Sequence, residues 1–479
     1  NPNVTSGDNF VFSSTFTSVE WSGEFIRQQM DLTTGALSGT IDWHAQAQLD
    51  AMVSAASDTR TIYTYTTDIS NFPTRLKPFT WTGSGSTYRV DTNLTATEQA
   101  YFGAAHIATL SQWPALNDTQ KALAAGKNLV NFLRGQTGYE DQASTATADR
   151  LYRDRIHTLG DIVSAEAVYV KKPQFSYTDA GYDTFKTANQ SRQGMVYVPA
   201  NDGMLHAFNA DTGQEAWAYV PSIVLPDLFK LADKQYSNLH RYFVDGTPVV
   251  GDAFIGGAWK TILVGGLNAG GRGYYALDIT DPANPKALWE FKVRDPSVTT
   301  CATTPAEAVG QTDDCDLGLS FGNPVITKKK DGTWVVLVTS GYNNISPGNG
   351  EGYLYVLNAA TGAIIDKIGT GQGSTGTPSG LAKISAWADD PMKDNTSLRV
   401  YGGDLLGNLW RFDIHGGENG LDVGAPGKDA HNLAIFRGGG GGTQPVTTKP
   451  ELGQVGTHVM VFVGTGREIG RASCRERVY

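Results

Sequence analysis

The sequence predicts an all-β fold, a β-propeller that carries a helical insertion. A strand–turn–strand pattern recurs along the chain, with Gly and Asp or Asn at its turns and apolar, β-rich runs between them. Glycine makes up 56 of the 479 residues, roughly 12% against a usual 7%, and it shows no collagen period. Such an irregular repeat is typical of propeller blades, so the expected propeller covers residues 1–467.

The clearest repeat is a predicted hairpin. Met195-Val-Tyr-Val-Pro199 is an apolar strand, and Met204-Leu-His-Ala-Phe208 is the return strand. Asn201-Asp202-Gly203 lies between them, because these residues tolerate the positive φ of tight turns. Asp211-Thr212-Gly213 closes the unit. The same shape recurs at residues 273–280, 351–362 and 407–414.

A second type of strand precedes these turns and is nearly continuous in its apolar character. The four examples are residues 262–266, 334–338, 400–403 and 459–463. This pattern predicts inner strands buried on both faces, where glycine permits close approach. The partner strands carry aromatic residues expected to pack between blades: Phe208, Tyr275, Tyr355 and Trp410.

The first third of the chain repeats less. Strands are expected at residues 9–18, 21–27 and 61–67, and a long polar surface loop at 135–155. Between them, about residues 93–135 turn helical. Thr95 and Glu98 have the spacing of a capping box, and two helices are predicted at 99–110 and 119–133.

The charge and the hydropathy of the sequence argue against nucleic-acid binding and against a membrane-spanning helix. The net charge of −10 disfavours nucleic acid, whose binding proteins carry basic patches. The sequence lacks an apolar stretch near the ~20 residues that a membrane-spanning helix needs. Without an initiator Met or a signal peptide, the chain is expected to be a segment of a longer protein.

The number of cysteines available for pairing depends on whether the C-terminal tail is native. Residues 468–479 include Glu468-Ile-Gly-Arg-Ala-Ser-Cys-Arg-Glu-Arg-Val478, which resembles a translated sequencing adapter, so this tail is expected to be non-native. The remaining cysteines, Cys301 and Cys315, flank a polar loop. Either they form a disulfide, as in an exported protein, or they are two free buried thiols.

Several motifs together resemble the PilC/PilY family of type IV pilus biogenesis factors. The motifs are Asn131-Phe-Leu-Arg-Gly135, Arg153-Asp-Arg155, Leu159-Gly-Asp-Ile-Val-Ser164, Ala200-Asn-Asp-Gly-Met-Leu-His-Ala-Phe208, Tyr219-Val-Pro-Ser222, Val244-Asp-Gly-Thr-Pro248, Leu277-Asp-Ile-Thr280 and Gly402-Gly-Asp-Leu-Leu-Gly-Asn-Leu-Trp-Arg-Phe-Asp413. The resemblance implies a propeller of seven modified quinoprotein-like blades, of which the last is expected to be incomplete here.

The resemblance also implies a function and a place of action. The family is exported and acts at the outer membrane, the pilus tip or outside the cell. It opposes pilus retraction and supports twitching motility and adhesion. Expected partners are pilins or minor pilins, and a host or surface receptor.

Some members of that family bind Ca²⁺ in a loop before the strand that begins here at Tyr401. The candidate oxygen donors in this chain are Asp389, Asp390, Asp394 and Asn395. Their spacing is not the alternating one of calcium loops, and Pro391 stiffens the segment. Leu398 stands where a closing acid is expected, so any binding should be weak.

A quinoprotein-like dehydrogenase is the alternative function, since its propeller has similar blades. Such an enzyme needs a stacking Trp, a carboxylate base and an acid–amide metal site. The recurring turn acids Asp202, Asp278, Asp404 and Asp413 are expected instead to cap backbone N–H groups. His206 is expected to face a neighbouring blade rather than a metal. The sequence therefore favours a non-catalytic scaffold.

Overall fold

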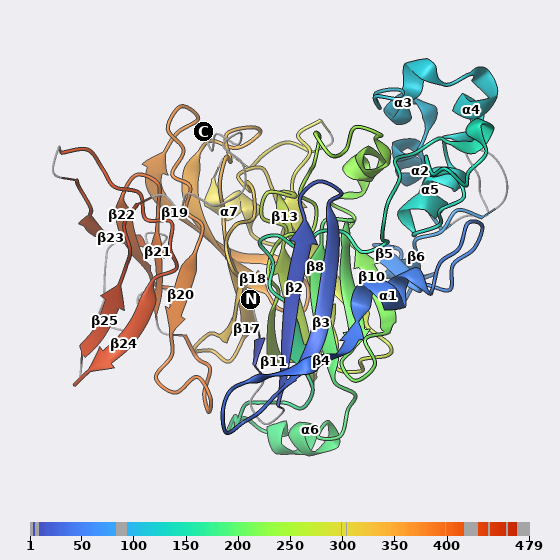
Figure 1. Ribbon diagram of the computed structural model, residues 1–479. Coiled ribbons are helices and arrows are strands. Elements are labelled where there is room, and N and C mark those ends of the chain that lie inside the picture. The colour runs from blue at the N-terminus through green and yellow to red at the C-terminus, as the bar shows by residue number, and fades with distance from the viewer. Residues whose placement is uncertain are drawn as a thin grey trace. The chain divides into compact units, whose positions relative to one another are not determined.

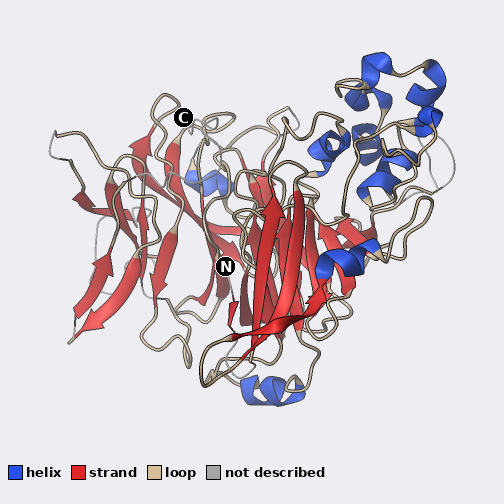
Figure 2. Ribbon diagram, viewed as in Figure 1, coloured by secondary structure: helices blue, strands red, loops and turns tan. Residues whose placement is uncertain are grey.

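The structure is a computed structural model that describes residues 3–4, 9–82, 93–297, 299–302, 304–397, 399–415, 430–438, 441–456 and 458–466. Strands dominate the described chain (Figure 2). The chain divides into two compact units. Unit 1 consists of residues 1–171, 192–247 and 281–286, and unit 2 of residues 172–191, 248–280 and 287–479.

In the part of unit 1 that the structure describes, the strands form two sheets (Figure 1). The first is antiparallel, in the order β1 (Asn3–Val4), β2 (Phe10–Thr17), β3 (Ser22–Met30), β4 (Leu37–His44). The second runs in the order β6 (Leu76–Pro78), β5 (Ile62–Tyr65), β10 (Glu215–Val220), β9 (Met204–Asn209), β8 (Met195–Ala200), β7 (Val168–Val170). Strand β5 joins β10 in parallel, which extends an antiparallel four-stranded sheet.

The predicted hairpin of β8 and β9 is confirmed. The two strands pair antiparallel from Met195–Asn209 to Ala200–Met204. Gly203 has a φ of +93°, and a Cβ there would lie 2.3 Å from Leu228 Cδ2. Glycine at this turn is therefore required by both the backbone conformation and the lack of space.

The helical insertion is confirmed, but its two expected helices are wrong. The structure has shorter ones, which are α2 (Ala96–Tyr101), α3 (Ala104–Ile107), η1 (Trp113–Ala115), α4 (Asp118–Leu123) and α5 (Lys127–Leu133). The Thr95–Glu98 capping box is present. Gly126, with a φ of +71°, separates α4 from α5, and Pro114 lies in η1 between α3 and α4. Other helices of unit 1 are α1 (Ala45–Asp50), η2 (Thr147–Asp149) and η3 (Leu225–Ala232).

The expected surface loop at 135–155 needs a correction. It is irregular apart from η2, as predicted. However, Glu140, Leu151 and Tyr152 are all completely buried. The Tyr152 hydroxyl donates a hydrogen bond to the Ala124 carbonyl, so this loop is anchored to the helical insertion.

The described residues of unit 2 form four sheets. Their strand orders are β11 (Val249–Ile255), β12 (Ala258–Gly266), β13 (Gly273–Asp278), β14 (Lys286–Val293), β15 (Asp313–Asp314); β16 (Val325–Lys328), β17 (Trp334–Thr339), β18 (Glu351–Asn358), β19 (Ile364–Gly373); β20 (Ile384–Trp387), β21 (Arg399–Gly403), β22 (Asn408–Phe412), β23 (Ala430–Ile435); and β24 (Glu451–Val455), β25 (His458–Phe462). Two short helices are α6 (Tyr182–Ala188) and α7 (Pro305–Ala308).

Three of the four predicted inner strands are confirmed as buried. Strand β17 is buried throughout, and β12 and β21 are buried over most of their lengths. A Cβ on Gly265 would lie 2.4 Å from the Tyr275 ring, so glycine does permit close approach. Strand β25 is different: Met460 and Phe462 are exposed. Among the described residues β25 pairs only with β24, so the prediction of a buried inner strand is wrong there.

Each unit has a turn that closes against a tryptophan ring. In unit 1, Gly213 has a φ of +73°, and its missing Cβ would lie 2.6 Å from the Trp43 ring. In unit 2, Gly362 has a φ of +71° and the corresponding distance to Trp289 is 2.7 Å. Both indole N–H groups donate to the carbonyl three residues before the glycine. Both units therefore close a blade with the same kind of turn, in which a glycine of positive φ packs against a tryptophan ring.

Candidate functional site

Three of the sequence motifs in unit 1, at residues 159–164, 200–208 and 244–248, meet around the β8–β9 turn. Three hydrogen bonds between motifs join Gly160 N to Asp202 Oδ2 (3.1 Å), Asn201 Nδ2 to Asp161 Oδ2 (2.7 Å), and Ser164 N to Asp245 Oδ1 (2.9 Å). His240 Nε2 lies 2.9 Å from the same Asp161 oxygen. Burial raises the pKa of Asp245 to about 6, against the lowering effect of its Ser164 hydrogen bonds. The motifs thus form one connected polar cluster.

A buried cluster of four charged side chains lies under this turn, and we call it the His206 cluster: Arg60, Asp202, His206 and Glu215. Arg60 donates two hydrogen bonds of 2.8 Å to the Glu215 carboxylate. His206 Nδ1 lies 2.7 Å from Glu215, and its Nε2 lies 3.0 Å from Asp202. The expectation that His206 faces a neighbouring blade is therefore wrong, since its ring lies between carboxylates of its own sheet and turn.

The pKa values of His206 and Glu215 follow from the alternation of positive and negative side chains in the cluster. Burial alone would lower the pKa of His206, but Asp202 and Glu215 outweigh it and raise the pKa to about 9. Burial alone would raise the pKa of Glu215, but Arg60 and His206 outweigh it and lower the pKa to about 2. At neutral pH the cluster is therefore a set of paired ions.

The His206 cluster is built for structure rather than for acid–base chemistry. The side chains of Arg60, His206 and Glu215 are at most 1% exposed, so a substrate cannot reach them. Asp202 also accepts a hydrogen bond from Met204 N, which confirms its predicted role as a turn cap. Sequence reasoning missed Arg60 and Glu215. The available signal was a charged residue at the start of an otherwise apolar strand.

Two arginines of the motifs, Arg134 and Arg155, are also structural. Arg134, at the end of α5, forms an ion pair with Asp58 and donates to the Phe79 and Arg60 carbonyls. Arg155 pairs with Glu140 at 2.6 Å. Burial raises the pKa of Glu140 even though Arg155 opposes it.

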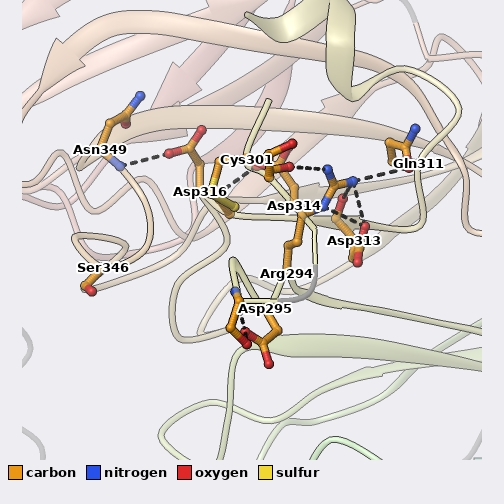
Figure 3. Close-up of a disulfide and its surroundings, with 12 residues drawn as sticks. Arg294, Asp295, Cys301, Gln311, Asp313, Asp314, Asp316, Ser346 and Asn349 are labelled. Atoms are coloured by element: carbon orange, nitrogen blue, oxygen red, sulfur yellow. Dashed lines mark hydrogen bonds and ion pairs between the residues drawn. A yellow bond between two sulfur atoms is a disulfide. The ribbon is translucent and has the colours of Figure 1, made fainter. Parts of the chain in front are cut away.

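In unit 2 the structure joins Cys301 and Cys315 in a disulfide (Figure 3). This confirms the disulfide and excludes the alternative of two free thiols. The loop so closed carries Asp313, which pairs with Arg294 at 2.8 Å. Arg294 also donates to the Thr300 carbonyl next to Cys301. The two ends of the loop are therefore held by a covalent bond and by one arginine.

The residues on either side of Cys315 form a second buried charge cluster, the Lys367 cluster, with Lys367 of β19. Lys367 Nζ lies 2.9 Å from Asp314 Oδ1 and 2.7 Å from Asp316 Oδ2. The Tyr355 hydroxyl donates to Asp314 at 3.0 Å, and Asn349 N donates to Asp316 at 2.8 Å (Figure 3 shows the latter). Burial, and then the nearby carboxylates, raise the pKa of Tyr355.

The four candidate calcium ligands lie in one loop but have separate partners. Asp389 accepts from the Trp387 indole at 3.0 Å, and Asp390 pairs with Lys393 at 3.2 Å. The other two point elsewhere: Asp394 Oδ1 lies 3.1 Å from Lys328 Nζ, and Asn395 Nδ2 donates to the Ile326 carbonyl at 3.0 Å.

The calcium site stays a prediction. Leu398, the position of the missing acid, lies outside the described residues. Within the described part of the chain, there is no group of three or more His, Cys, Asp or Glu that could hold a metal ion. Over the same residues, none of the helices is long and apolar enough for a membrane span.

Comparison with known proteins places the chain in a family. A sequence model of the PilY1 β-propeller domain matches residues 159–477. The type IV pilus biogenesis factor PilY1 of Pseudomonas aeruginosa strain PAK is 34% identical over 97% of this chain and 37% of that protein. A PilY1 homolog of Xylella fastidiosa strain Temecula1 is 33% identical over 81% of this chain and 30% of that protein.

The chain thus spans about a third of the length of these curated relatives. A solved structure, the crystal structure of the P. aeruginosa PilY1 C-terminal domain, is 33% identical to the chain. The alignment covers 64% of this chain and 60% of that one, with a TM-score of 0.49.

Proposed function

Because the chain belongs to the PilY1 β-propeller domain family, we propose that it is the scaffold of a type IV pilus biogenesis factor. In this role it opposes pilus retraction and supports twitching motility and surface attachment. The observation that carries the proposal is the family match over residues 159–477, together with 34% identity over 97% of the chain.

The buried chemistry supports a scaffold rather than a catalyst. Both charge clusters are enclosed and internally paired, which rigidifies a fold without offering a reactive group. Loops on a rigid scaffold commonly carry recognition, so we assign binding of pilins or minor pilins to the loops and the helical insertion. The expected location is exported, at the outer membrane, at the pilus tip or outside the cell.

The test is an in-frame deletion of residues 159–466 from the gene of a piliated host. Surface pili and twitching are then measured with retraction active and with retraction disabled. We expect loss of surface pili when retraction is active and their return when it is disabled. Normal piliation in the first case would contradict the role, and continued absence in the second would contradict the opposition to retraction.

The alternative of a quinoprotein-like dehydrogenase makes a separate prediction. Titration of the purified chain with pyrroloquinoline quinone and Ca²⁺ should then change the absorbance of the quinone and support oxidation of an alcohol. The scaffold proposal predicts neither change.

A further inference from the structure

The Lys367 cluster of unit 2 holds an amine and two carboxyl groups together away from water. Asp314 is 2% exposed, Lys367 4% and Asp316 6%. Lys367 Nζ lies 2.9 Å from Asp314 Oδ1, which is one bond from the carboxyl carbon, and 2.7 Å from Asp316 Oδ2. Reacting atoms held about 3–3.5 Å apart are already in a near-attack geometry. An amine and a carboxyl group in this position can remain a salt bridge or condense to an amide.

Asp314 Oδ1 accepts hydrogen bonds that fit the charge developed during such a condensation. The backbone N–H of Asp316 donates to it at 2.8 Å, and the Tyr355 hydroxyl donates to it at 3.0 Å. Burial, and then the nearby carboxylates, raise the pKa of Tyr355, so this hydroxyl keeps the proton that it donates. Two fixed donors on one oxygen are the arrangement that stabilises the oxyanion of a tetrahedral intermediate in acyl transfer.

We propose that Lys367 and Asp314 form an intramolecular amide bond, and that Asp316 transfers the protons. Asp316 passes one proton from the Lys367 ammonium to Asp314 Oδ2, and burial favours the neutral amine and acid that result. The amine attacks the Asp314 carboxyl carbon, and Asp316 passes a second proton from the nitrogen to Oδ2. The C–N bond forms, the C–Oδ2 bond breaks, and one water leaves with both protons.

The amide and the disulfide constrain different segments. The amide joins residues 53 apart in the sequence, whereas the disulfide joins residues 14 apart. The amide fixes Asp314 to β19, so the loop that begins at Cys301 is still held by the disulfide. Because the reaction occurs once and consumes both groups, the cluster offers nothing to an outside substrate. The inference does not depend on the proposed pilus role.

Mass spectrometry of the whole purified chain tests the bond directly. After reduction and alkylation of the cysteines, the intact mass should be one water lower than the mass of the sequence. Digestion should yield a branched peptide that joins Lys367 to Asp314. A full mass without a branched peptide would overturn the proposal, and a branch at Asp316 would overturn the choice of Asp314.

Two variants distinguish this bond from other losses of water. Lys367→Arg keeps a cation but should restore the full mass, whereas a succinimide elsewhere in the chain would persist and overturn the assignment. Asp316→Asn should slow the reaction at least about a hundredfold, because its amide cannot transfer the protons, so the freshly synthesised variant should have the full mass. Complete cross-linking in that variant would overturn the role of Asp316. The intact mass of the unmodified chain decides the proposal whether or not the variants fold.

Lys328 is a matched control within unit 2. It also lies between two carboxylates, 2.6 Å from Asp179 and 3.1 Å from Asp394. These carboxylate side chains are 28% and 58% exposed, so hydration keeps both groups charged. We expect no branched peptide that contains Lys328. Equal branching at Lys328 would show that proximity alone suffices, and would overturn the roles assigned to burial and to Tyr355.

Discussion

The two units both bury charge, but they organise it differently. In unit 1, His206 and Glu215 lie in neighbouring strands of one sheet, Arg60 lies two residues before the next strand, β5, and Asp202 lies in a turn of that sheet. In unit 2, Asp314 and Asp316 flank Cys315 in an irregular segment and reach Lys367. Backbone ladders therefore position the first cluster, whereas a covalent bond helps to position the second.

Removing one cation tests how much the stability of the His206 cluster depends on its ion pairs. Arg60→Met should destabilise the protein by about 3–5 kcal/mol, because it leaves the buried Glu215 carboxylate without its guanidinium partner and the cluster with an uncompensated negative charge. The free energy of unfolding from urea titration measures this loss. Arg27→Met is the control, because its partners are more accessible, with Asp211 65% exposed. It should cost about 1 kcal/mol or less. Equal losses in the two variants would contradict the account.

Removing the disulfide should show most clearly how the stabilisation of unit 2 differs from that of unit 1. Cys301→Ser combined with Cys315→Ser opens a loop with a sequence separation of 14 residues. The chain-entropy model gives a loss of about 3 kcal/mol. Reductant should reproduce the loss in the unmodified chain and add nothing in the double variant. A stability unaffected by reductant would show that the segment is held by its hydrogen bonds alone.

The turn beside the His206 cluster is tested by Gly203→Val. Positive φ and the nearby Leu228 side chain should together cost about 2 kcal/mol, measured as a lower melting temperature. Gly35→Val is a matched control, because Gly35 has a φ of +72° with nothing within 4 Å of the added Cβ. It isolates the backbone strain, so its loss should be the smaller one.

The pH dependence should come from unit 1. The pKa of His206 is raised from 6.5 to about 9, so its stabilising contribution is present below pH 6.5 and is lost as the pH rises through about 9. The pKa of Glu215 is lowered from 4.5 to about 2, so its contribution is lost as the pH falls from 4.5 toward 2. His206→Asn should remove the alkaline loss measured by thermal unfolding. A variant that keeps the full alkaline loss would contradict this assignment.

Calcium should have the smallest effect. The candidate ligands Asp389, Asp390, Asp394 and Asn395 offer no clear bidentate closing acid. At ~1 mM Ca²⁺ a site of roughly millimolar affinity stabilises by well under 1 kcal/mol. We expect little thermal shift with Ca²⁺ or a chelator, and a larger one in Leu398→Asp. A sub-micromolar dissociation constant by calorimetry would refute this.

Local patterns in the sequence were sufficient for the blade strands and their turns. The β8–β9 hairpin, the Gly203 turn and the Thr95 capping box all follow from short-range rules. The helix predicted at 119–133 is interrupted at Gly126. The positive φ of this residue cannot be recognised from helical periodicity alone. The seven-blade count and the adapter tail stay predictions, and residues 467–479 lie outside the described chain.

The charge clusters could not be predicted, because their members come from distant parts of the chain. Arg60 and Glu215 are 155 residues apart, and β5 meets β10 through a parallel pairing that no local pattern indicates. Lys367 and Asp314 are likewise 53 residues apart. The sequence did suggest the disulfide, but not that the two acids beside Cys315 would bind one lysine.

The most direct test of the difference between the units is amide hydrogen exchange with and without reductant. Loss of the disulfide should reduce protection at residues 313–317 and at the neighbouring β18 and β19. Strands β8, β9 and β10 around the His206 cluster should keep theirs. Equal loss of protection in both units, or no loss around Lys367, would contradict the claim that sheet pairing positions the first cluster and that the disulfide helps to position the second.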